Sequence, residues 1–169
     1  MPSYLQIENI SKSYGTKVLF ENIAFNINEG DKIALIAPNG TGKTSLMRIL
    51  AGKDKSDSGG SIKFLKEVRI AFLEQEFEHD PLKTIEEQIM DTPDFEYQLR
   101  AKRILDEFGL KPGQRMCELS GGEVKRVALT QMLASDADFL IMDEPTNHLD
   151  LDAIEYLENY LKRSRCTLF

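Results

Sequence analysis

The segment from residue 32 to residue 50 combines three patterns that together allow few folds. The almost continuously apolar run KIALIA is typical of a strand covered on both faces in a parallel sheet. It leads into the glycine-rich segment APNGTGKT, and the helical pattern SLMRIL follows. A phosphate-binding loop lies at such a position, because backbone N–H groups can point inward and the helix N-terminus adds a favourable dipole. We therefore expect an α/β protein with a phosphate-binding loop.

The loop carries the polar groups needed to bind the phosphates and magnesium ion of a nucleoside triphosphate. Lys43 is expected to reach the outer phosphates, and the Thr44 hydroxyl is expected to bind magnesium. Ala37 replaces the first glycine of the strict pattern G-x-x-x-x-G-K-[ST], which is tolerable if its φ angle is negative. The other loop residues expected to bind the cofactor are Asn39, Gly40, Thr41, Gly42 and Ser45. The loop predicts a bound nucleotide phosphate and Mg2+, with a chance glycine-rich turn as the alternative.

Two adjacent acids, Asp143 and Glu144, end the apolar run FLIM. A magnesium ion held by Thr44 needs an acidic partner on a neighbouring strand, and Asp143 suits that role, often through a water ligand. Glu144 can then face the terminal phosphate and deprotonate the attacking water. The alternative, a polar strand end or helix cap, is weak once the phosphate loop is present. The pair predicts a nucleotide hydrolase with Glu144 as the base.

Composition and charge exclude several other classes. The chain has 169 residues, 41% hydrophobic and 29% charged, which fits one ordinary globular domain with a core of its own. Its net charge of -7 argues against a generally basic surface for nucleic acid. No apolar run approaches the roughly 20 residues of a membrane span, and the N-terminus lacks a signal-peptide layout, so we expect a cytoplasmic protein without membrane insertion. Cys117 and Cys166 are expected to be reduced thiols.

Hydrophobic spacing divides the chain into a strand-rich part and a helical part. The expected strands are residues 5–14, 21–30, 32–37, 68–75 and 138–143. The expected helices are residues 84–90, 98–108, 121–134 and 151–163, the second with Leu99, Ile104, Leu105 and Phe108 on one face. Residues 1–169 are thus expected to form one domain. Residues 1–76 and 135–169 make its β subdomain and α/β core, and residues 77–134 make an inserted helical subdomain.

Further motifs resemble one family. The segment LSGGE at 119–123 resembles the signature motif of the ATP-binding-cassette (ABC) ATPases, Gln75 in FLEQ resembles their Q-loop glutamine, and HLD at 148–150 resembles their D-loop. The resemblance extends from about Tyr4 to the end of the chain. It implies a P-loop NTPase cassette with a parallel-sheet core, an N-terminal antiparallel β subdomain and an inserted helical subdomain.

The resemblance also implies roles for particular residues. Two cassettes would form a head-to-tail dimer in which Ser120, Gly121 and Gly122 of one complete the ATP site of the other, and Asp150 would make a contact across this dimer. Gln75 would act in catalysis, sensing the γ-phosphate through magnesium. Tyr14 would stack on adenine, although a tyrosine that merely closes a hairpin is nearly as good an interpretation.

The run DEPTNHLD followed by LDAIEYLENYL resembles the ABC-F group, whose members have two cassettes in one chain and no membrane domain. The chain would be the N-terminal cassette, and the resemblance implies the ribosome and tRNA as partners of a translation or antibiotic-resistance factor. Three alternatives stay open. They are the ATPase subunit of a transporter, a chromosome-maintenance ATPase, and a switch that binds ATP without hydrolysing it.

Two departures limit what the resemblance implies. Neither His79 nor His148 fits the family's switch histidine. We therefore expect a fragment that stops before this histidine and lacks the second cassette. Such a fragment is expected to bind ATP weakly and to hydrolyse it slowly. The interval from Gln75 to Ser120 is also short for an ABC-F protein, so an arm is expected to be missing near residues 91–97.

Overall fold

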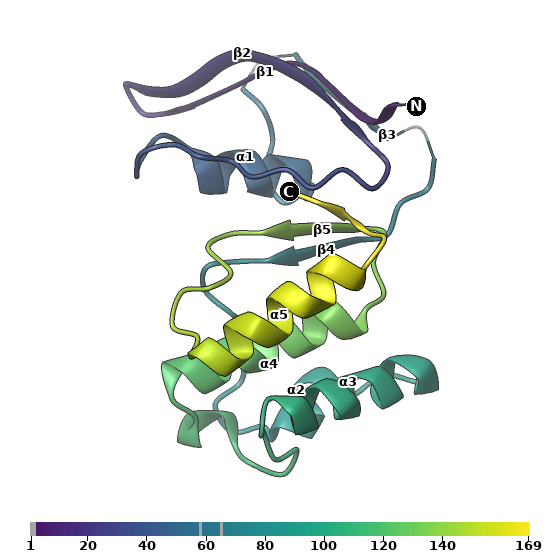
Figure 1. The fold of residues 1–169 in the computed structure, drawn as a ribbon. Coiled ribbons are helices and arrows are strands. Elements are labelled where there is room, and N and C mark those ends of the chain that lie inside the picture. The colour runs from purple at the N-terminus through teal and green to yellow at the C-terminus, as the bar shows by residue number, and fades with distance from the viewer. Residues whose placement is uncertain (1–2, 58, 65) are drawn as a thin grey trace. The chain divides into compact units, whose positions relative to one another are not determined.

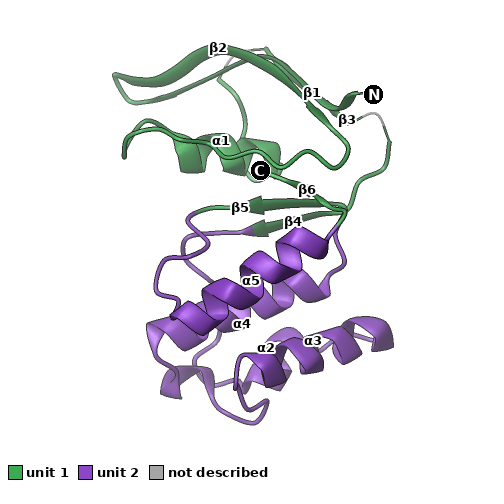
Figure 2. Ribbon diagram, viewed as in Figure 1, with its two compact units in different colours: residues 1–72, 138–143, 165–169 green, residues 73–137, 144–164 purple. Residues whose placement is uncertain are grey.

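A computed structural model describes residues 3–57, 59–64 and 66–169 of the chain (Figure 1). The chain divides into two compact units, coloured separately in Figure 2. The first, called the sheet unit, comprises residues 1–72, 138–143 and 165–169. The second, called the helical unit, comprises residues 73–137 and 144–164. The boundary between the two units thus falls between the two adjacent acids Asp143 and Glu144.

Two small sheets and one helix build most of the sheet unit. Strands β1 (Ser3–Tyr14) and β2 (Lys17–Asn28) form a long antiparallel hairpin, and β3 (Ser61–Phe64) pairs with the other edge of β1. The second sheet has the order β4 (Ile70–Leu73), β5 (Phe139–Met142) and β6 (Thr167–Leu168), with β5 and β6 parallel. This mixture of antiparallel and parallel sheets confirms the predicted fold class. Strand β3 was not predicted, because four residues after a Ser- and Gly-rich turn carry little signal.

Helix α1 (Lys43–Leu50) is held against the hairpin by its apolar face. Figure 1 shows the hairpin of β1 and β2 along one side of this helix. The shared core consists of alternating residues of the hairpin, the inner face of α1 and two residues of β5, namely Tyr4, Leu5, Ile7, Ile10, Ile27, Leu46, Met47, Ile49, Leu50, Phe139 and Ile141, together with Phe169. Each such side chain stabilises the fold by about 1.5–3 kcal/mol on burial. The N-terminus of α1, and the loop before it, are therefore fixed in place.

The prediction of a doubly covered strand at residues 32–37 was wrong. Only Lys32 forms a bridge, in parallel with Leu168, and the Ile33 N–H donates to the Leu168 carbonyl at 3.0 Å. Ile36 is 92% exposed. A ladder needs a neighbouring backbone, and among the described residues this segment pairs with β6 (Thr167–Leu168) at Lys32 alone. The segment runs into the loop as extended chain.

The helical unit contains four α-helices among its described residues. They are α2 (Ile85–Ile89), α3 (Phe95–Glu107), α4 (Gly121–Ala134) and α5 (Leu151–Arg163), with the short 3-10 helix η1 (Met116–Glu118) before α4. A side chain accepts a hydrogen bond from the first turn of each α-helix, and these caps are Thr84, Asp94, Ser120 and Asp150. No helix in the described part of the chain is long and apolar enough to cross a membrane.

The observed division differs from the expected one at α5, which was expected to belong with the α/β core. In the structure the Tyr160 hydroxyl donates to the Leu133 carbonyl at 3.1 Å, and the Tyr156 ring packs edge-on against Phe108 at 5.0 Å. These contacts join α5 to α4 and to the C-terminal end of α3. The helical unit therefore includes residues 144–164 and begins at Leu73.

The buried face of α3 also differs from the prediction. It is formed by Ala101, Ile104 and Leu105, with Phe108 buried at the C-cap, whereas Leu99 is 36% exposed. The spacing 101, 104, 105 and 108 follows one stripe of a helix with 3.6 residues per turn, and position 99 falls outside it. Leu99 was therefore wrongly placed on the buried face.

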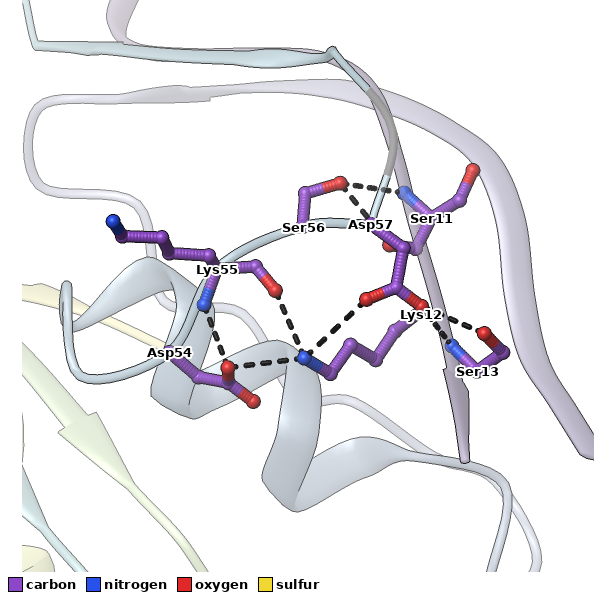
Figure 3. Close-up of polar contacts among 7 residues, drawn as sticks. All are labelled: Ser11, Lys12, Ser13, Asp54, Lys55, Ser56 and Asp57. Carbon is purple, nitrogen blue, oxygen red and sulfur yellow. Dashed lines mark hydrogen bonds and ion pairs between the residues drawn. The ribbon is translucent and has the colours of Figure 1, made fainter. Parts of the chain in front are cut away.

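A network of polar side chains fastens the segment after α1 to β1 (Figure 3). The Lys12 ammonium donates to Asp54 Oδ1 at 3.0 Å and to the Lys55 carbonyl at 2.9 Å, and lies 3.6 Å from Asp57 Oδ1. The hydrogen bond from Lys12 lowers the pKa of the Asp54 carboxyl, and the same bond raises the pKa of Lys12. The Lys12 side chain is only 12% exposed. The network therefore fixes the segment that follows the C-terminal end of α1, opposite to the end that carries the loop.

Replacing Lys12 by methionine is expected to lower the free energy of unfolding by about 1–2 kcal/mol at pH 7. The value lies at the low end for charged hydrogen bonds because Asp54 and Asp57 are 35% and 42% exposed. A lowered carboxyl pKa stabilises the fold above the unfolded-state pKa, and this stability is lost as pH falls through the folded-state pKa. Urea unfolding should therefore show a smaller difference between variant and wild type below about pH 4 than at pH 7.

The matched control is Lys63→Met on β3, an exposed lysine, which should change stability little at either pH. Equal losses in the two variants would show that the Lys12 network contributes nothing.

Candidate functional site

The loop between residues 37 and 43 closes around the Lys43 ammonium. Lys43 Nζ donates to the Ala37 carbonyl at 2.7 Å, to the Pro38 carbonyl at 3.3 Å and to Asn39 Oδ1 at 3.3 Å. The Thr41 hydroxyl donates to the Pro38 carbonyl at 2.8 Å and tightens the same turn. No carboxylate in the described part of the chain pairs with Lys43. The loop thus presents a positive charge that no acid neutralises.

Gly42 is required at its position by two constraints. Its φ angle of 96° lies in the left-handed region, and a Cβ there would lie 2.9 Å from Leu19 Cβ and 3.1 Å from the Phe20 ring. Strand β2 therefore packs directly on the loop and holds its backbone.

The N-terminus of α1 differs from those of the other α-helices in the described residues. Gly42 supplies no side-chain cap, and the first turn contains no acidic residue. The backbone N–H groups in the first turn of the helix, including those of Thr44 and Ser45, thus have no intrahelical or side-chain acceptor. Free N–H groups and the helix dipole together favour an anion at this end.

Thr44 and Asp143 come together across 99 positions of sequence. The Thr44 hydroxyl donates to Asp143 Oδ2 at 2.5 Å, and Asp143 is 2% exposed at the end of β5. A hydroxyl and a carboxylate are the oxygen ligands that Mg2+ prefers, and a buried carboxylate is stabilised by a nearby cation. No cluster of three or more His, Cys, Asp or Glu suited to a metal occurs in the described residues. These two residues therefore fit a Mg2+ whose other ligands are phosphate oxygens and water, as is usual for this ion.

The tip of the hairpin carries Tyr14 and Lys17, and Lys17 contacts this loop. Tyr14 is 76% exposed, and its cross-strand partner is Lys17. Lys17 Nζ donates to the Gly40 carbonyl at 3.0 Å. An exposed tyrosine is free to stack on a base, which keeps both predicted interpretations of Tyr14 open. The Lys17 contact was not predicted, because a lysine in a hairpin gives no sign of a partner 23 residues away.

In the helical unit, Glu144 has an unusual backbone and a fixed side chain. Its φ angle is 47°, and Asn147 Nδ2 donates to Glu144 Oε2 at 2.5 Å. His148, in the same loop, has a φ angle of 63°. Left-handed residues other than glycine, asparagine, aspartate and histidine are uncommon and are concentrated at functional sites, so the conformation of Glu144 is the unusual one. Asn147 was not predicted, although an amide three residues after the acid is within reach in a tight loop.

The predicted signature residues begin helix α4. Ser120 Oγ accepts from the Glu123 N–H at 3.3 Å, and the Glu123 carboxylate accepts from Ser120 N at 2.8 Å and from Ser120 Oγ at 2.7 Å. The hydrogen bond from the Ser120 backbone lowers the pKa of Glu123. Gly121 has open space around it, but a Cβ on Gly122 would lie 2.6 Å from the His148 carbonyl oxygen. The start of α4 therefore lies directly against the loop that follows Glu144.

Asp150, expected to make a contact across a dimer, has two partners within its own unit. Its Oδ1 accepts from the Ala153 N–H at 2.9 Å and caps α5, while its Oδ2 lies 3.3 Å from Arg126 Nη1 on α4. The Asp150 side chain remains 53% exposed. It can therefore hold α5 to α4 and still face a partner. The Arg126 contact was not predicted, because the two residues are distant in sequence.

Gln75 lies at the beginning of the helical unit, after β4, with its side chain exposed. The preceding carbonyl, of Glu74, accepts from Lys125 Nζ on α4 at 3.4 Å. Lys125 is buried, 6% exposed. Gln75, Ser120, Gly122, Glu144 and Asp150 thus share one unit, while the loop, Tyr14 and Asp143 belong to the other.

The sequence is similar to those of known proteins. The family model described as ABC transporter matches residues 20–147. "ABC transporter F family member 5" of Arabidopsis thaliana is 34% identical over 95% of this chain and 30% of its own length. "Ribosome protection protein VmlR" of Bacillus subtilis is 33% identical over 98% of this chain and 30% of its own length. "Energy-dependent translational throttle protein EttA" of Escherichia coli K12 is 34% identical over 93% of this chain and 30% of its own length.

Solved structures show the same fold. A dimeric ATP-binding cassette in a post-hydrolysis state, bound to ADP and phosphate, has a TM-score of 0.83 and 25% identity, over 97% of this chain and 85% of that one. The chain spans about 30% of the length of the curated relatives it matches. On the family match and these likenesses, the chain belongs to the ATP-binding-cassette (ABC) family of ATPases, and its relatives include ABC-F proteins.

Proposed function

We propose that the chain is the cassette with which a cytoplasmic ABC-F protein binds and hydrolyses ATP. The observation that carries this proposal is the contact between Thr44 and the buried Asp143, beside an uncapped helix N-terminus and the unneutralised Lys43. Lys43 and the loop amides would hold the phosphates, and Tyr14 would stack on the adenine. Thr44 and Asp143 would hold Mg2+, with Gln75 as a further ligand.

In the hydrolytic step the two neighbouring acids would have different tasks: Asp143 would hold Mg2+, and Glu144 would act as the base. Bound Mg2+ would neutralise charge on the phosphate oxygens. Glu144 would take a proton from a water molecule as its oxygen attacks the γ-phosphorus, while the bond from that phosphorus to the β-phosphate oxygen breaks and ADP leaves. Asn147 holds Oε2 of Glu144, and Oε1 has no hydrogen-bond partner among the described residues, so it is available for the water.

A second cassette would complete the site. Ser120, Gly121 and Gly122 would face the γ-phosphate bound by the partner cassette, with Asp150 at the same surface. The dimeric cassette of similar fold supports this arrangement. ATP would close the two cassettes and hydrolysis would open them.

The names of two relatives, a ribosome protection protein and a translational throttle protein, support the ribosome as the partner of the whole protein. The second candidate is a transporter subunit. The description of the matching family model, ABC transporter, supports it. A solved "ATP binding subunit of ABC transporter" with a TM-score of 0.86 is 21% identical and shows the fold alone.

Co-sedimentation with ribosomes separates the two candidates. The full-length protein carrying Glu144→Gln, which should hold ATP without hydrolysing it, is expected to pellet with ribosomes when Mg-ATP is present and to stay in the supernatant without it. A protein that binds Mg-ATP tightly but never pellets would contradict the ribosomal partner and leave the cassette assignment intact.

A further inference from the structure

We propose that Lys17 is a second cationic ligand for the phosphates of the nucleotide, beside Lys43. The proposal rests on the ATP-binding function proposed above and adds a residue to the same site. Lys17 is the first residue of β2, and its side chain is exposed. Its Nζ donates to the Gly40 carbonyl at 3.0 Å and lies 3.6 Å from the position of a Cβ on Gly40. The ammonium group is therefore already on the phosphate-binding loop.

The hairpin directs Lys17 to the loop by its register. Tyr14 and Lys17 are cross-strand partners, so their side chains project from the same face of the hairpin. Two and three residues later on β2, Leu19 Cβ and the Phe20 ring lie 2.9 Å and 3.1 Å from the position of a Cβ on Gly42. Packing of β2 on the loop thus holds Lys17 next to the place where the phosphates would bind.

The charge around Lys17 favours an anion rather than a purely structural role. The chain has 28 acidic residues, and Lys12, Lys66 and Lys162 each pair with a carboxylate. Neither Lys17 nor Lys43 does so within the described residues, and both donate instead to carbonyls of the same loop. An ammonium group has three N–H donors. Lys17 uses one of them on Gly40 and can offer the others to phosphate oxygens, which would neutralise both lysines.

The test compares substitutions that separate charge from hydrogen bonding. Dissociation constants for Mg-ATP are measured by titration calorimetry with the full chain carrying Lys17→Ala, Lys17→Gln or Lys17→Arg. The shorter glutamine side chain keeps an amide N–H donor but carries no charge. We expect the Ala and Gln variants to bind Mg-ATP about five- to tenfold more weakly, and the Arg variant to bind within about twofold of wild type.

Two further variants calibrate the result. Lys63→Ala on β3 makes the same change of charge away from the loop and should leave affinity unchanged, whereas Lys43→Ala should weaken binding more than any change at Lys17. Thermal unfolding without nucleotide shows whether each variant is folded. The loss at Lys17 should also shrink with rising salt, because an exposed charge is screened.

Two results would overturn the assignment of Lys17. Wild-type affinity in Lys17→Gln together with a loss in Lys17→Ala would show that the lysine only braces the Gly40 carbonyl. Unchanged affinity in both, with a clear loss in Lys43→Ala, would show that Lys17 does not contribute to binding. If wild-type protein and Lys43→Ala bind Mg-ATP equally, or neither binds it, the proposed ATP site itself fails, and this outcome is distinct from the other two.

Discussion

The Glu144→Gln variant is expected to bind Mg-ATP as wild type does and to hydrolyse it about 10²- to 10³-fold more slowly. Glutamine has nearly the same shape, and its amide can keep a hydrogen bond with Asn147, so the loop should retain its conformation. It cannot accept a proton from water at neutral pH. The expected loss is therefore in kcat, with little change in KM, as for a group that acts in the transition state.

The measurement is steady-state phosphate release by the full-length protein, with nucleotide affinity determined in parallel. Glu155→Gln, an exposed position on α5, makes the same chemical change away from the loop and should have wild-type activity. Wild-type turnover in Glu144→Gln would refute the role of Glu144 as the base. An equal loss in both glutamine variants would attribute the effect to stability rather than to proton transfer.

Adding a single methyl group at Gly122 is expected to lower the free energy of unfolding by about 2–3 kcal/mol, whereas the same change at Gly121 should be neutral or slightly stabilising. The Cβ of Gly122→Ala would lie 2.6 Å from the His148 carbonyl oxygen, which is backbone and cannot rotate away. The Cβ of Gly121→Ala meets no atom within 4 Å. The start of α4 and the loop that contains His148 must therefore move apart in Gly122→Ala but not in Gly121→Ala.

Urea unfolding of the two variants provides the comparison, because both exchange glycine for alanine in the first turn of α4. Limited proteolysis of the first variant is expected to show faster cleavage in residues 144–150. Equal stability of the two variants would contradict the close packing of α4 on this loop. A loss of stability in Gly121→Ala alone would show that Gly121, and not Gly122, is the closely packed glycine.

Local patterns predicted several elements closely. Helix α4 occupies residues 121–134 and α5 occupies residues 151–163, both as expected from their spacing. In each case a polar side chain directly before the first turn caps the helix, so the start is encoded within a few residues. The proximity of Thr44 and Asp143 was expected from chemistry, because both residues were predicted to bind the same magnesium ion.

Other features depend on contacts between distant segments, which a single sequence does not reveal. Residues 32–37 have the composition of a buried strand, yet among the described residues only Lys32 of this segment forms a bridge, with Leu168. The assignment of α5 to the helical unit depends on contacts of Tyr156 and Tyr160 with α3 and α4. In the sequence, Lys17 and Arg126 resemble ordinary solvent-exposed charged residues, and only the structure shows their contacts with Gly40 and Asp150.

The most direct test of the proposed site is the magnesium dependence of ATP affinity in wild-type protein and in Asp143→Asn. Calorimetric titration is carried out with Mg2+ and with a chelator in its place. Wild-type protein should bind ATP at least about tenfold more tightly with Mg2+, and the variant should show less than about a twofold difference. Equal dependence on Mg2+ in the two proteins, or none in either, would contradict the assignment of Thr44 and Asp143 as the magnesium site.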